Sequence, residues 1–126
     1  MVAVDTNVLV RLVTGDDPKQ VSSAQDFISN GAWVSLLVLA ETSWVLASGY
    51  DRKPAAIASA VDMLLNHREL VLQDPEVVAA ALEHFRKKPG LGFSDCLVLE
   101  TARKAGHLPL GTLDRKLSKL DGTQLV

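Results

Sequence analysis

Short apolar runs of strand length alternate with longer segments of helical pattern along the chain, and this alternation constrains the fold more than any other feature. The first run, at 2–4, is β-branched and ends at Asp5-Thr6-Asn7, where a helix is expected to begin. Strands that are separated by helices pair in parallel, because each crossover helix carries the chain back to the same edge of the sheet. We therefore expect an α/β fold with three α/β/α layers around a mainly parallel central sheet.

Capping residues and helix breakers set the bounds of the expected elements. Asp17-Pro18 and Asp74-Pro75 open helices, and Ser94 is expected to cap another. The expected helices cover 6–13, 17–30, 36–48, 54–67, 74–88, 94–106 and 114–120, and the later strands cover 32–35, 69–72, 108–113 and 123–126. Asp5 and Asp114 each follow an expected strand, so both are expected at the carboxyl edge of the sheet, where such folds bind ligands.

Composition bounds the class of protein. The 126 residues are expected to form one domain, 1–126, because a content of 48% hydrophobic and 22% charged residues suits a packed core. The single cysteine, Cys96, cannot form an internal disulfide, which favours a reducing compartment. No apolar run is long enough to span a membrane and the N-terminus lacks a basic signal region, so we expect a cytoplasmic protein. The net charge of −2 offers no general attraction for nucleic acid, so phosphate binding would need local basic patches or metal ions.

Four of the fifteen acidic side chains are harder to explain by solvation or capping than the rest: Asp5, Glu41, Asp95 and Asp114. The helical neighbours of Glu41 are all apolar, so a bare carboxylate there would pay a desolvation cost; they are Leu37, Val38, Trp44 and Val45. Simpler explanations exist for each acid. Glu41 could pair with an arginine or lie at the edge of the apolar stripe, Asp5 and Asp114 could cap helices, and Asp95 suits the first turn of its helix.

A divalent cation would allow the four carboxylates to converge, because without one they would repel each other and some would stay protonated. Mg²⁺ prefers oxygen ligands and binds one or two carboxylates directly while it keeps several waters. A zinc site is not indicated, since the three histidines are scattered and one cysteine is too few. The acids therefore favour an oxygen-ligated metal site.

Several motifs together resemble the PIN-domain ribonucleases, and more narrowly the toxin component of VapBC-type toxin–antitoxin pairs. They are Val-Asp-Thr-Asn at 4–7, the helical Glu41, Asp95 at a helix start, and Thr112-Leu113-Asp114-Arg115-Lys116-Leu117. The resemblance spans essentially the whole chain, in the same order and with similar spacing. It implies endonucleolytic cleavage of RNA dependent on Mg²⁺ or Mn²⁺, a homodimer, and inhibition by a cognate antitoxin protein.

The same resemblance implies roles for individual residues. Asp5 and Asp95 would bind the metal, and Glu41 and Asp114 would complete the acidic pocket. Asn7 and Thr112 would support these acids or their waters by hydrogen bonds. Basic side chains would dock the RNA locally, and the candidates are Arg11, Arg86, Lys87, Lys88, Arg115 and Lys116. The run 86–88 also has a structural explanation, because cations are favoured at the C-terminus of a helix.

Two other functions remain open at this point. One is a Mg²⁺-dependent phosphohydrolase with Asp5 as the nucleophile, although such enzymes usually carry a second aspartate two residues on, where this chain has Asn7. The other is an inactive PIN-like domain that binds a partner protein. Trp33 and Trp44 could serve such an interface, but tryptophans of this kind lie more often in the core.

Overall fold

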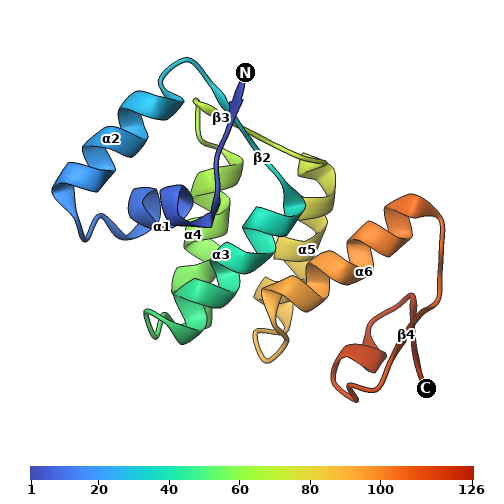
Figure 1. Cartoon of the computed structure of the whole chain (residues 1–126). Coiled ribbons are helices and arrows are strands. Elements are labelled where there is room, and N and C mark those ends of the chain that lie inside the picture. Colours follow the sequence, from blue (N-terminus) through green and yellow to red (C-terminus); the bar gives the residue numbers. More distant parts are fainter.

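The computed structural model describes residues 1–126 and confirms the expected fold class, because helices flank a parallel sheet (Figure 1). The strands β1 (Val2–Ala3), β2 (Ala32–Val34) and β3 (Leu70–Leu72) lie in the order β1-β2-β3, and both pairs are parallel. The helices are α1 (Thr6–Thr14), α2 (Pro18–Ile28), α3 (Leu36–Ser48), α4 (Pro54–Leu65), α5 (Pro75–Lys87) and α6 (Phe93–Ala105). No helix is long and apolar enough to cross a membrane.

Local capping explains where most helices begin and end. The side chain of Asp17 accepts a hydrogen bond from Gln20 N at 3.1 Å, and the side chain of Ser35 accepts one from Val38 N at 3.1 Å. Gly106 ends α6 in the left-handed region at φ 82°, where a side chain would be strained. The expectation for Ser94 is wrong: Gly92 is the N-cap of α6, so Ser94 and Asp95 both lie in the first turn.

The last two strands of the expected sheet form a separate C-terminal unit. This unit consists of β4 (Leu110–Thr112), the 3₁₀ helix η1 (Leu117–Lys119) and β5 (Thr123–Leu125), in which β4 and β5 pair in parallel with each other alone. Figure 1 shows the unit in orange and red beyond α6, well away from β1. The expectation that Asp5 and Asp114 share one sheet edge is therefore wrong, because they follow strands of different sheets.

The short first strand accounts for this division. Both residues of β1 are exposed and only Val4, just beyond it, is buried, so the expectation of a buried first strand is also wrong. β1 offers little surface on which β4 could pack. The C-terminal unit is held elsewhere: Leu117 is buried in the core cluster, and Arg103 on α6 donates from Nη2 to the carbonyl oxygen of Asp121 at 2.8 Å.

Extensive packing between α5 and α6 fixes the helix that carries Asp95. Between them the carboxylate of Glu100 is buried and pairs with His84 Nε2 at 3.0 Å and with Arg103 Nε at 3.1 Å. Lys104 Nζ also binds Asp74 Oδ1 at 2.6 Å, which joins the end of α6 to the start of α5. The second half of α6 is therefore held firmly against α5.

Candidate active site

The charge of Asp114 acts on the carboxyl of Asp95. Asp95 is half-buried in the first turn of α6, and its Oδ2 lies 3.4 Å from the position that a Cβ on Gly92 would take. Burial raises the pKa of the Asp95 carboxyl, and the negative charge of Asp114 raises it further. A carboxylate that is desolvated next to a like charge is one that a cation would stabilise.

Hydrogen bonds in the turn after β4 hold Asp114 in place. Its backbone N–H donates to Thr112 Oγ1 at 3.0 Å, while its Oδ1 accepts from Lys116 N at 2.8 Å and from Leu117 N at 3.2 Å. Oδ2 makes no hydrogen bond and is free for a ligand. Thr112 thus supports Asp114 through the backbone rather than through the carboxylate, and the capping explanation for Asp114 also holds for the turn that leads into η1.

Asp5 and Asn7 lie at the start of α1. Asp5 is exposed and caps α1, because its Oδ1 accepts from Val8 N at 3.3 Å. The side chain of Asn7 is exposed and makes no hydrogen bond to an acid. Asp5 belongs to no group of three or more acidic, histidine or cysteine side chains that could hold a metal ion.

Glu41 lies on the outer side of α3, so the expectation that apolar neighbours enclose it is wrong. Its neighbours Leu37 and Trp44 are 77% and 66% exposed, whereas the buried face of the helix is formed by Leu39, Thr42, Ser43 and Leu46. Helix α3 is apolar on nearly all sides, so its sequence did not reveal which side faces the core. The exposure of Trp44 and Trp33 also corrects the view of both as core residues.

Taken together, the acids form a pair rather than a cluster of four. No three aspartate, glutamate, histidine or cysteine side chains are close enough to hold a metal ion. Two carboxylates with water are nevertheless a donor set that suits Mg²⁺ or Mn²⁺, and they lack the nitrogen or sulfur ligands that zinc prefers. The Asp95–Asp114 pair therefore fits a divalent cation that retains several waters.

Three of the basic residues expected to dock RNA are already paired within the chain. Arg11 Nη1 binds Asp16 Oδ1 at 3.3 Å and Tyr50 Oη at 2.8 Å, Lys87 pairs with Glu83 at 3.1 Å, and Arg86 lies 3.9 Å from Asp62. Arg115 is exposed, and Lys88 and Lys116 meet around a small pocket of about 150 Å³. Lys119 also lines this pocket and was missed, although it lies three residues after Lys116, a spacing that places two side chains on one side of a helical turn.

The PIN domain family matches residues 2–123, nearly the whole chain. The chain belongs to the PIN domain family. No curated protein sequence matches it closely enough to add a relative. PIN domains are generally nucleases that use divalent metals, so this PIN domain is a candidate hydrolase of nucleic acid.

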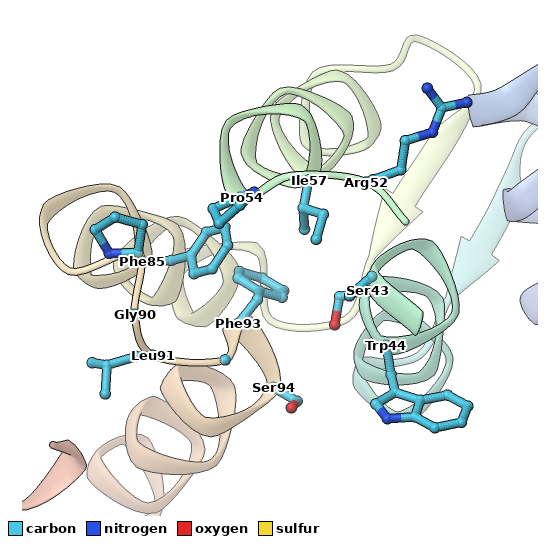
Figure 2. Close-up of a pocket in the computed structure, with 13 residues that line it drawn as sticks. Ser43, Trp44, Arg52, Pro54, Ile57, Phe85, Gly90, Leu91, Phe93 and Ser94 are labelled. Atoms are coloured by element: carbon cyan, nitrogen blue, oxygen red, sulfur yellow. The ribbon is translucent and has the colours of Figure 1, made fainter. Parts of the chain in front are cut away.

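An aromatic cavity of about 310 Å³ opens beside the first turn of α6 in this PIN domain (Figure 2). Phe85 and Phe93 both line it, with ring centroids 5.9 Å apart and planes at 75°. Figure 2 shows Ser43 and Trp44 on α3 and Ser94 at the start of α6, and the exposed indole of Trp44 points away from the two phenylalanine rings. Sequence reasoning missed this cavity because its lining comes from α3, α4, α5 and α6, with no local motif to mark it.

Proposed function

We propose that this PIN domain is an endoribonuclease that depends on Mg²⁺ or Mn²⁺, and that residues 1–126 act as one nuclease domain. The match of the PIN domain family to residues 2–123 carries the proposal, and the half-buried Asp95, whose pKa is raised by burial and by the charge of Asp114, supports it. Two carboxylates that repel each other in the free protein become mutually compatible when a cation lies between them. Asp95 stands in the first turn of α6, and Asp114 stands in the turn after β4.

The chain's own contribution is to hold two carboxylates and to move a proton. Asp95 is fixed by α6, and Asp114 by its three hydrogen bonds in the turn after β4. A divalent cation would polarise the phosphodiester, make the attacking water more acidic and offset charge on the leaving oxygen. We propose that a carboxylate of the acidic set accepts the proton of this water, so that the products carry a 5′-phosphate and a 3′-hydroxyl.

We keep Asp5 and Glu41 in the proposed site because the motifs around them match the family pattern, with Asp5 as a further metal ligand. Helix α1, which Asp5 caps, packs on α3, which carries Glu41, and α3 packs on α6. Thr112 supports Asp114, and Asn7 is proposed to support Asp5 through water. Among the docking residues, Lys88, Lys116 and Arg115 have no ion pair and are the stronger candidates, ahead of Arg11, Arg86 and Lys87.

The test is cleavage of single-stranded RNA by the purified protein with Mg²⁺, with Mn²⁺, or with EDTA. We expect cleavage with either metal and none with EDTA. Asp95→Asn and Asp114→Asn should lower kcat/KM by at least about a hundredfold, since even outer partners of metal ligands cost about 10- to 100-fold. Asp121→Asn is the matched control, because Asp121 is an exposed acid of the same C-terminal unit.

Two results would overturn this proposal. Cleavage that persists in EDTA would remove the metal dependence, and cleavage that survives both Asp95→Asn and Asp114→Asn would remove the acid pair. Asp5→Asn and Glu41→Gln, assayed beside them, measure whether these two acids contribute to the same reaction. Release of phosphate from small phosphomonoesters, with RNA left intact, would favour a phosphohydrolase instead.

We also propose that the protein is the toxin of a type II toxin–antitoxin pair, acts in the cytoplasm, and forms a homodimer. Support comes from the motif resemblance and from large apolar side chains left on the surface, which include Leu37, Val98 and Leu113. A short neighbouring reading frame whose product binds this chain and inhibits its cleavage of RNA would support the toxin role. Sedimentation equilibrium tests the dimer, and a monomer at all concentrations would contradict it.

A further inference from the structure

Two hollows of this PIN domain adjoin the same loop, Lys88–Gly92. The aromatic cavity lies on the side of Phe93 and Ser94, and the lysine pocket is the small pocket formed by Lys88, Lys116 and Lys119; both are lined by Gly90 and Leu91. We propose that they bind neighbouring parts of one single-stranded RNA. An unstacked base enters the aromatic cavity, and a backbone phosphate next to it lies on the three lysines. This inference rests on the nuclease function proposed above and specifies how the strand is held.

The shape and lining of the aromatic cavity suit a flat heterocycle. Its volume of about 310 Å³ lies at the lower end of small-molecule pockets, and apolar side chains form most of its lining. The Trp44 indole, which also lines the cavity, is 66% exposed and stacks on no other ring. The hydroxyl of Ser94, in the same lining, makes no hydrogen bond and can meet the polar edge of a base. Phe85 and Phe93 are each only 3% exposed, so Trp44 provides the exposed aromatic face on which an unstacked base would stack.

The lysine pocket suits an anion. None of its three lysines is in an ion pair, whereas Lys87, next to Lys88 in the chain, is paired with Glu83. No carboxylate lines the pocket, so the three ammonium groups repel one another until an anion neutralises them. The net charge of the chain is −2, so this pocket is a local region of positive charge on a protein that is negative overall.

A residue that lines each hollow is next in the chain, or hydrogen-bonded, to Asp95 or Asp114. This arrangement favours a nuclease substrate over another occupant. Ser94, in the cavity lining, precedes Asp95 in the first turn of α6. Lys116, in the lysine pocket, donates its backbone N–H to Asp114 Oδ1 at 2.8 Å. A strand held at both hollows would therefore bring a phosphodiester next to the acids. An apolar protein segment could fill the aromatic cavity but would leave the lysines without an anion.

Fluorescence of Trp44 tests the base-binding half of the proposal. Trp33→Phe leaves Trp44 as the only tryptophan, and Asp95→Asn in Mg²⁺ keeps the RNA intact. We expect a short single-stranded oligoribonucleotide to quench Trp44, and the same sequence in a duplex to leave the signal nearly unchanged, because paired bases cannot enter the cavity. Trp44→Ala should weaken binding of the single strand by about fivefold or more, the low end of what base–aromatic stacking supplies.

The salt dependence of binding tests the phosphate-binding half. Each of Lys88→Ala, Lys116→Ala and Lys119→Ala should weaken RNA binding. The slope of log Kd against log salt should fall by about 0.7 for each phosphate contact that is lost from a single strand. Lys19→Ala is the control, because Lys19 is an exposed lysine on α2 that has no ion pair and lines neither hollow.

The outcomes separate this inference from the nuclease proposal. If the unsubstituted protein cleaves RNA with Mg²⁺ but the Trp44 and lysine variants bind RNA unchanged, this inference is overturned and the nuclease function stands. Equal quenching by single strand and duplex overturns the base-binding half. If the protein neither cleaves nor binds RNA, both proposals are overturned.

Discussion

The charge of Asp114, in the turn after β4, raises the pKa of Asp95, in the first turn of α6. The two residues belong to different parts of the molecule, since α6 packs against the main body and β4 belongs to the C-terminal unit. Their electrostatic interaction therefore depends on how the C-terminal unit is seated. The pKa of Asp95 therefore reports how the C-terminal unit is seated against α6.

Removing the charge of Asp114 should lower the pKa of Asp95 without restoring its ordinary value. Burial is the larger of the two causes that raise this pKa, and Asp114→Asn removes only the smaller one. An NMR titration of the Asp95 side-chain carboxyl measures the change. Asp121→Asn serves as the control, and an Asp95 pKa that is the same in the Asp114→Asn protein would show that the two charges do not interact.

Asp95→Asn should stabilise the protein near neutral pH but not in acid. Because the pKa of Asp95 is raised on folding, its charged form costs stability above the folded pKa, and this cost disappears below the ordinary value of 3.8. Thermal melts of both proteins across pH should show a modest gain in Tm that is lost as pH falls. Mg²⁺ should reduce the difference in Tm between the two proteins, because the cation offsets the charge of Asp95 only in the protein that keeps this carboxylate. A gain that is constant with pH would point to a cause other than ionisation.

Loss of the buried carboxylate between α5 and α6 should be costly. Glu100→Ala leaves His84 and Arg103 without the partner they share, and we expect a loss of about 1–3 kcal/mol in the free energy of unfolding. Glu83→Ala removes an exposed pair with Lys87 and should cost less than about 0.5 kcal/mol. Urea denaturation of the two variants gives the comparison, and equal losses would contradict the structural role assigned to Glu100.

Leu117 should act as the anchor of the C-terminal unit. This side chain is only 5% exposed within the core cluster, so Leu117→Ala should cost about 2–5 kcal/mol. Leu113→Ala is the natural comparison in the same unit, because Leu113 is 80% exposed and its loss should change stability by no more than about 0.5 kcal/mol. Hydrogen exchange should also become faster in β4 and β5 of the Leu117 variant, and unchanged exchange there would count against the anchor.

Cys96 should be unreactive in the folded protein. Burial, together with the negative charges of Asp95 and Glu100, raises the pKa of its thiol from 9.0 to about 11, so the thiolate fraction near neutral pH falls about a hundredfold. Reaction with a disulfide reagent should be slow in buffer and fast in urea. Rapid reaction in buffer would mean that the first turn of α6 opens readily.

Much of the helical structure was predictable because its signals are local. Asp17 and Ser35 cap helices with their own side chains, and the bounds of α1, α3 and α5 differ from expectation by at most one residue at each end. The pairing of strands was less accessible. Whether β4 joins β1 depends on contacts between segments far apart in the chain, and a two-residue β1 gives little sign of its exposure.

The candidate site, too, was predictable only where its signals are local in the sequence. Position drew attention to Asp95 at a helix start and to Asp114 after a strand, but the family resemblance rather than position assigned both to the site. The direction of Glu41 was not accessible, because a helix that is apolar all round carries no periodic signal for its buried side. Lys119 and the aromatic cavity depend on how loop and helix ends meet in space, which spacing in the sequence does not encode.

The open outer edge of β1 has a practical consequence. In a parallel pair, successive residues direct their backbone groups to opposite sides of the strand. The N–H of Val4 donates to the carbonyl oxygen of Trp33 on β2. Ala3, the residue before Val4, therefore directs its own N–H and C=O away from the sheet. A long unpaired edge of this kind can pair with strands of other chains and cause aggregation. This edge is too short to do so. A strand-forming extension fused ahead of Met1 would lengthen that edge and seed aggregation, so an affinity tag rich in glycine, serine or charged residues is the safer choice at this end.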